Sequence, residues 1–92
     1  MISVYHNSNF LAAHRIGLKE AIKQGILIKV ADVDTEDLDK AYELTNNIDH
    51  SWWENTEVTK CVPGSIRSTS VGDVLIHNEI KYAVDIMGFT RI

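Results

Sequence analysis

Four consecutive residues in the second half of the chain, Arg67-Ser68-Thr69-Ser70, carry the groups that bind anions in proteins. The arginine offers a planar guanidinium fork that matches a phosphate or a carboxylate. Three adjacent hydroxyl groups add further donors. The segment is therefore a candidate site for a phosphate-bearing or carboxylate-bearing ligand.

The same segment also has a structural interpretation, which the sequence favours. Hydroxyl residues before a turn commonly satisfy backbone groups. Ser70 would then cap a tight turn over residues 71–73, and Arg67 would pair with Asp49 or Glu54. Asp73 would accept hydrogen bonds from backbone amides at the start of the next strand.

The Trp52-Trp53 pair is the second feature with recognisable chemistry. Successive side chains of an extended segment point to opposite sides, so we expect one indole in the core and the other near the surface. Structural anchoring is the favoured role, and an exposed aromatic anchor for a partner is the alternative. The candidate binding residues of this loop are Asp49, His50, Trp52, Trp53, Glu54 and Asn55.

No assembled catalytic or metal-binding pattern is visible along the chain. The four histidines have no helical spacing to one another, and Cys61 is the only cysteine, so the ligand spacing of a zinc site is absent. No nucleophile elbow or phosphate-cradling glycine loop occurs. We therefore expect no metal and no cofactor, and we favour a binding role over enzymatic activity.

Charge is distributed unevenly. The net charge of −4 argues against non-specific binding to a polyanion. Residues 31–57 contain nine acidic residues against Lys40 alone. Such a segment can form an acidic recognition face, although a solvated helix surface is the simpler interpretation.

Apolar periodicity predicts an α+β domain that spans residues 1–92. A strand over 2–5 is followed by helix over 10–25, either continuous or broken at Gly17, with Leu11, Leu18, Ala21 and Ile22 on one face. Ser8 or Asn9 would cap this helix. A central strand over 26–33 precedes a helix capped by Asp34 or Thr35, with Leu38, Ala41, Tyr42 and Thr45 buried and Asn46-Asn47 at its end.

The second half of the chain is rich in predicted strands. They cover residues 58–62, 74–77, 81–86 and 89–92, with a hairpin turn at Asn78-Glu79. Together these elements predict a small antiparallel or mixed sheet packed against two or three helices.

The composition also indicates a compartment. One cysteine permits no internal disulfide, which suits a reducing cytosol. The first residues lack the pattern of a signal peptide, and no apolar run is long enough to cross a bilayer. We expect a cytoplasmic protein without membrane contact.

Several strings in the chain resemble small proteins of unknown function carried by phages and plasmids. They follow the pattern I-D-x-x-W-W-E-N over 48–55, R-S-T-S-V-G-D-V over 67–74, and Gly88-Phe89 near the end. The last two are also similar to YodL-like domains. The resemblance covers residues 26–92. It implies a mobile-element setting, in the host cytoplasm, in which the motif residues work as one unit, and it supplies no activity.

We therefore expect an accessory protein that binds a host or phage protein. The acidic helix and the tryptophan loop would form its surface, and residues 67–73 would brace it. One alternative is a nucleic-acid binder that uses an exposed tryptophan and the basic residues Arg15, Lys19, Lys23, Lys29 and Arg67. Another is a small enzyme acting on a phosphorylated or nucleotide ligand through Arg67, Ser68, Ser70, Asp73 and His50. An exposed sheet edge would also allow a homodimer.

Overall fold

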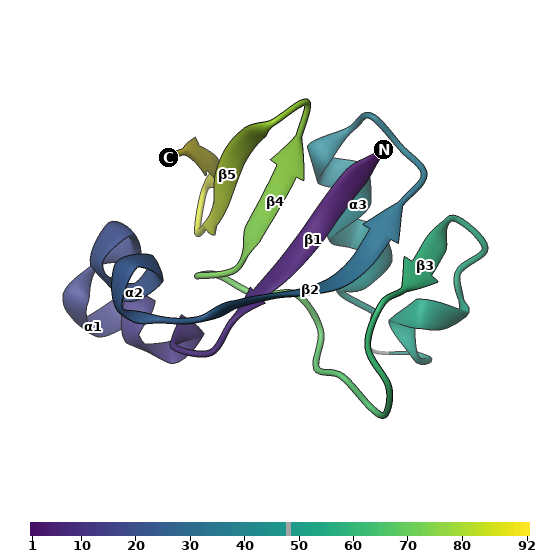
Figure 1. The fold of residues 1–92 in the computed structure, drawn as a ribbon, viewed down its shortest axis with the longest axis horizontal. Coiled ribbons are helices and arrows are strands. Elements are labelled where there is room, and N and C mark those ends of the chain that lie inside the picture. Colours follow the sequence, from purple (N-terminus) through teal and green to yellow (C-terminus); the bar gives the residue numbers. More distant parts are fainter. Residues whose placement is uncertain (48) are drawn as a thin grey trace.

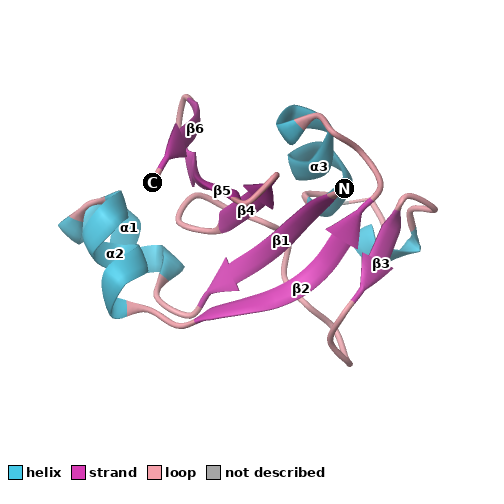
Figure 2. Ribbon diagram, turned by 45° about the horizontal axis from the view of Figure 1, so that its top comes forward, coloured by secondary structure: helices cyan, strands magenta, loops and turns pink. Residues whose placement is uncertain are grey.

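Six antiparallel strands form one sheet in the computed structural model, which describes residues 1–47 and 49–92. The strands lie in the order β3-β2-β1-β4-β5-β6, so β1 and β4 are central (Figures 1 and 2). The α+β class is confirmed, and every strand pairing is antiparallel. The strands are β1 (Ile2–Asn7), β2 (Leu27–Val33), β3 (Val58–Lys60), β4 (Val74–His77), β5 (Ile80–Asp85) and β6 (Gly88–Arg91).

Three α-helices and two short 3-10 turns accompany the sheet. They are α1 (Ala13–Ile16), α2 (Leu18–Gln24) and α3 (Leu38–Thr45), with 3-10 turns over Phe10–Ala12 and Trp52–Glu54. Helix α3 covers one face of the sheet, whereas α1 and α2 lie at the end where β1 stops and β2 starts (Figure 1). None of the helices in the described residues is long and apolar enough to cross a membrane.

The first helical region breaks at Gly17, as one of the two sequence interpretations predicts. Gly17 has a φ of 91°, a conformation that L side chains rarely adopt. The predicted shared face is wrong for Leu11, which is 72% exposed. The break turns the segment before Gly17 out of line with α2, so the residues no longer share one helical surface. Asn9 holds the predicted N-cap position before Phe10, but its side chain makes no capping bond, and Ser8 Oγ accepts a hydrogen bond from the Ile26 amide.

Helix α3 begins later than the sequence suggests. Asp37, not Asp34 or Thr35, is its N-cap, and the Asp37 carboxylate accepts a hydrogen bond from the Asp39 amide. The chain first makes a turn in which the Thr35 amide donates to the Val33 carbonyl, and this turn delays the helix. The helix ends at Asn46, as predicted.

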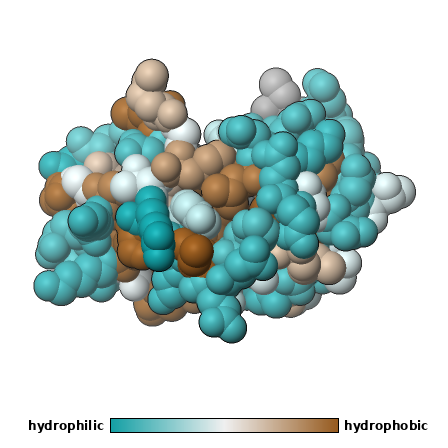
Figure 3. Space-filling view, turned by 90° about the horizontal axis from the view of Figure 1, so that it is seen from above, coloured by the Kyte–Doolittle hydropathy of each residue, from teal (hydrophilic) through white to brown (hydrophobic). Residues whose placement is uncertain are grey.

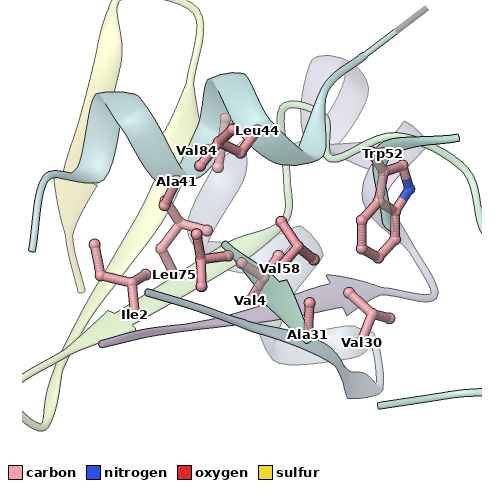
Figure 4. Packing of buried hydrophobic residues seen from close by; sticks show 11 residues of the cluster. Ile2, Val4, Val30, Ala31, Ala41, Leu44, Trp52, Val58, Leu75 and Val84 are labelled. Carbon is pink, nitrogen blue, oxygen red and sulfur yellow. The ribbon is translucent and has the colours of Figure 1, made fainter. Parts of the chain in front are cut away.

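The core lies between α3 and the sheet (Figure 4). Apolar side chains alternate along the strands, so one face of each meets the helix. Ala41, Leu44 and Thr45 of α3 are buried, while Leu38 and Tyr42 are half-buried. The buried residues contributed by the strands are Ile2, Val4, Val30, Ala31, Val33, Val58, Leu75 and Val84.

The β4–β5 hairpin forms as predicted. Asn78 and Glu79 have φ values of 52° and 68°, which the right-handed twist of a two-residue hairpin requires. Strand β3 is shorter than predicted and ends at Lys60, although the Cys61 amide still donates to the Val30 carbonyl.

Gly72 lies close to the backbone of Phe10, and it generates the first prediction. It has a φ of 98°, and an added Cβ would lie 2.8 Å from the Phe10 carbonyl oxygen. We expect Gly72→Ala to lower the free energy of unfolding by roughly 2–4 kcal/mol, from left-handed strain plus overpacking. Urea denaturation measures the loss.

Gly64→Ala is the matched control, because Gly64 also has a positive φ but nothing lies within 4 Å of the added Cβ. We expect Gly64→Ala to lower the free energy of unfolding only by the contribution of left-handed backbone strain, about 1–2 kcal/mol. Equal losses in the two variants would contradict the importance of the close approach to Phe10.

Candidate functional site

An ion pair between a partly exposed arginine and a buried aspartate joins the two ends of the Arg67–Asp73 segment. Arg67 Nη1 lies 2.7 Å from Asp73 Oδ2, and Arg67 Nη2 lies 2.7 Å from Asp73 Oδ1. The predicted pairing of Arg67 with Asp49 or Glu54 is therefore wrong. Asp73 is fully buried, and a carboxylate in that position requires a cationic partner, whereas Asp49 and Glu54 are exposed to water.

Backbone amides complete the surroundings of Asp73, as the sequence predicts. The Asn7 amide donates to Oδ1 and the Ser70 amide donates to Oδ2, each at 2.8 Å. The Asp73 amide in turn donates to the Ser70 carbonyl, which closes the tight turn over residues 70–73. The turn is thus closed by the Ser70 backbone and the Asp73 carboxylate.

His6 and Asn7 belong to the same cluster, and sequence reasoning missed both. His6 Nε2 lies 3.0 Å from Thr69 Oγ1, and both side chains are buried. The Asn7 amide group donates to the carbonyls of Gly72 and Ala21. We call His6, Asn7, Arg67, Thr69, Ser70 and Asp73 the polar cluster.

Burial governs the protonation of His6. Loss of hydration lowers the pKa of this imidazole to about 4, outweighing the opposing attraction of Asp73, and the positive charge of Arg67 lowers it further. Although Asp73 Oδ2 lies 3.9 Å from His6 Nε2, the histidine is therefore neutral near pH 7 and makes no ion pair.

Phe10 covers the guanidinium group from outside. The Arg67 Cζ atom lies 3.5 Å from the centroid of the phenyl ring, within the range of a cation–π contact. Arg67 also donates to the carbonyls of Asn7 and Ser68. The guanidinium fork is thus occupied by groups of the protein itself.

The hydroxyl segment is also tied to the end of α3. The Thr69 amide donates to the Thr45 carbonyl, and the Asn46 side chain donates to the Thr69 carbonyl. Ser68 Oγ donates to the Asn47 carbonyl. The polar groups of Arg67, Ser68 and Thr69 therefore bind partners within the fold.

The two tryptophans divide as the sequence predicts. Trp52 is the buried one, and its Nε1 donates to the carbonyls of Ile66 and Arg67. Trp53 is half-buried and packs edge-on against Trp52, with ring centroids 5.3 Å apart. Lys60 Nζ lies 4.2 Å from the centroid of the Trp53 ring.

The polar residues of the tryptophan loop have separate environments. Asn55 is half-buried and donates to the Leu44 carbonyl, which fastens the loop to α3. His50 is exposed and lies 3.4 Å from side-chain atoms of Asn47 and Asn55. Asp49 and Glu54 are exposed. The loop therefore exposes Asp49, His50 and Glu54 to solvent and leaves Trp53 partly exposed.

The residues proposed for nucleic-acid binding are not gathered on one surface. Arg15, Lys19 and Lys23 lie on α1 and α2, at the end of the sheet away from the tryptophan loop (Figure 1). Lys29 pairs with Asp32 at 3.0 Å, and Arg67 is committed to Asp73.

A hollow lies between α3 and the β5–β6 hairpin, and the sequence does not predict it. It encloses about 210 Å³. Figure 3 shows a notch in the outline of the molecule, with hydrophobic surface at its floor and on the projection at its left, and largely hydrophilic surface to its right. Its lining residues are Asp39, Tyr42, Val71, Val84, Asp85, Ile86, Gly88 and Phe89. The sequence predicts the helix and the strands that carry most of these residues, but not that the residues meet around a hollow.

A second hollow of about 380 Å³ lies beside α2 and is lined by Lys19, Ile22, Lys23, Arg91 and Ile92. Neither hollow includes a residue proposed for the enzymatic alternative. In residues 1–47 and 49–92, no three acidic, histidine or cysteine side chains gather as metal ligands would. Comparison of the chain with protein-family models, curated proteins and solved structures gives no match.

The Arg67–Asp73 ion pair generates the second prediction. We expect Arg67→Gln to lower the free energy of unfolding by roughly 3–5 kcal/mol, because it leaves the Asp73 charge buried without its cation. Lys29→Gln, at a partly exposed pair with Asp32, should lose less than about 1 kcal/mol. Denaturant titration of both variants tests the difference, and similar losses would contradict a dominant role for the Arg67–Asp73 pair.

His6 generates the third prediction, a pH dependence. Its pKa falls from 6.5 in the unfolded chain to about 4 in the fold, so the unfolded state takes up the proton first as pH decreases. Stability is therefore fully present above about pH 6.5 and declines toward pH 4, by on the order of 3 kcal/mol. Urea denaturation between pH 7 and pH 4.5 measures this, and His6→Gln should flatten the curve. A slope that persists in His6→Gln would assign the effect to another group.

Proposed function

We propose that this protein works by binding another protein through the side that carries α3 and the β5–β6 hairpin. One observation carries the proposal: Ile86 and Met87 at the hairpin tip are 71% and 95% exposed, next to the apolar hollow. Exposed apolar side chains that adjoin a hollow mark interaction surfaces, whereas scattered ones do not.

The negative charge around this surface favours a protein partner of complementary charge. Asp37, Asp39 and Glu43 are exposed on and before α3. Lys40 is the one base of this helix, and its Nζ lies 3.8 Å from a Glu43 carboxylate oxygen. A surface with one sign of charge steers complementary partners and repels like-charged ones.

The tryptophan loop contributes further negative charge next to α3. It is fastened to α3 through the bond from Asn55 to the Leu44 carbonyl, and it adds the exposed carboxylates of Asp49 and Glu54. Trp52 acts as a structural anchor, because its ring is buried and its indole N–H is satisfied internally. The loop therefore adds charge to the proposed surface, while Trp52 itself is not available as an aromatic anchor.

The setting we propose is that of an accessory protein of a phage or plasmid, acting in the host cytoplasm. It rests on the resemblance of residues 26–92 to small proteins of such elements. The partner would then be a protein of the host or of the element itself.

The fourth prediction tests partner binding. Tagged protein immobilised on beads should capture a defined protein from bacterial lysate treated with nuclease, identified by mass spectrometry. We expect the variant Ile86→Ser/Met87→Ser to lose the captured protein without loss of stability, because both side chains are already exposed.

The control is Ile26→Ser/Ile28→Ser, which also removes two exposed apolar side chains, but from β2 and the residue that precedes it. It should capture the same protein as the unmodified chain. Capture that survives Ile86→Ser/Met87→Ser, or that disappears with nuclease, would falsify the proposal.

A further inference from the structure

The hollow between α3 and the β5–β6 hairpin has a shape that limits what can occupy it. Tyr42 of α3 and Phe89 of β6 line it and contact each other edge to face, with ring centroids 6.3 Å apart. Val71 and Val84 also line it. Its walls thus come from two elements distant in sequence, held by the same core that holds the sheet.

Its size favours a single side chain over a small-molecule ligand. Sites that bury a drug-sized molecule enclose about 300–1,000 Å³, and this hollow encloses about 210 Å³. An apolar anchor from a peptide segment needs less room, and such anchors dominate the affinity of many protein interfaces.

The charged residues of the hollow indicate the sign of the partner. Among the described residues that line it, Asp39 and Asp85 are the charged ones. Asp85 is held in place, since its carboxylate accepts hydrogen bonds from the Ile86 amide and from Thr90 Oγ1. A carboxylate oxygen has further lone pairs, so it can still accept from a cation. Within residues 1–47 and 49–92, no lysine or arginine lines the hollow to neutralise these two carboxylates.

Met87 completes the surface at the tip of the hairpin. Its unbranched thioether side chain is 95% exposed and can adapt to an apolar partner of irregular shape. Nucleic acid fits poorly here, because its phosphates would meet Asp39 and Asp85.

We infer that this hollow docks a basic amphipathic segment of a partner protein, placing one apolar side chain against the wall formed by Tyr42 and Phe89 and lysine or arginine residues against Asp39 and Asp85. The inference rests on the proposed function and specifies the chemistry of the partner. Recognition of this kind follows the helix-in-groove pattern, in which apolar anchors repeat along one face of the segment.

The fifth prediction uses three synthetic peptides titrated into the full chain. The first is a helical 14-residue peptide with leucines on one face and lysines on the other. The second carries glutamate in place of every lysine, and the third carries serine in place of every leucine. We expect the first to bind at least about tenfold more tightly than either of the others, as measured by fluorescence anisotropy. Amide shifts in the ¹⁵N-labelled chain should centre on Tyr42, Val71, Gly88 and Phe89.

Two pairs of variants locate the binding. Ile86→Ser/Met87→Ser and Asp39→Lys should each weaken the first peptide about tenfold. The matched controls, Ile26→Ser/Ile28→Ser and Asp34→Lys, change residues of the same type outside the hollow and should leave its affinity unchanged.

Several results would overturn the inference. They are equal binding of the glutamate or serine peptide, no binding of the first peptide, and amide shifts centred away from the hollow. Self-association that requires Ile86 and Met87 would make a second copy the occupant, through the basic hollow at Lys19, Lys23 and Arg91. If the peptide does not bind but capture from lysate still depends on Ile86 and Met87, this inference fails and the proposed function stands. Peptide binding at the hollow without such capture removes the proposed function instead.

Discussion

The carboxylate of Asp73 sets the constraint around which this small fold is arranged. A charge without exposure to water must be matched by donors, and Asp73 receives them from Arg67, from the Asn7 amide and from the Ser70 amide. These donors come from the end of β1 and from the segment before β4. One buried charge therefore brings together chain segments more than sixty residues apart.

The polar cluster connects this centre to the rest of the molecule. Phe10 covers the guanidinium and approaches Gly72, which draws in the helical end of the domain. Thr69 bonds to the end of α3, and Trp52 bonds to the Ile66 and Arg67 carbonyls. The segment over 66–73 is thus a structural hub, since helix, loop and sheet all form hydrogen bonds with it.

This arrangement separates the conspicuous residues from the surface available to a partner. The arginine, the hydroxyl groups and the buried tryptophan resemble binding chemistry in the sequence, yet their polar atoms bond mostly within the fold. The surface that remains open is defined by ordinary residues, Tyr42, Phe89, Ile86 and Met87, with carboxylates beside them. In a chain of 92 residues, a large share of the unusual chemistry is needed to complete the core.

The sequence by itself determined the features that depend on near neighbours in the chain. Alternation of apolar residues predicted most of the strands, Asn78-Glu79 predicted the hairpin, and the tryptophan pair predicted one buried ring and one near the surface. The role of Asp73 as an acceptor of backbone amides also followed from its local position. Only the tertiary structure decided which groups meet across long separations. It paired Arg67 with Asp73 instead of Asp49 or Glu54, placed His6 and Asn7 in the same cluster, and brought Tyr42 beside Phe89. The reason is physical: hydrogen bonding within a turn depends on adjacent residues, whereas burial of a charge and the shape of a hollow depend on the packing of the whole chain.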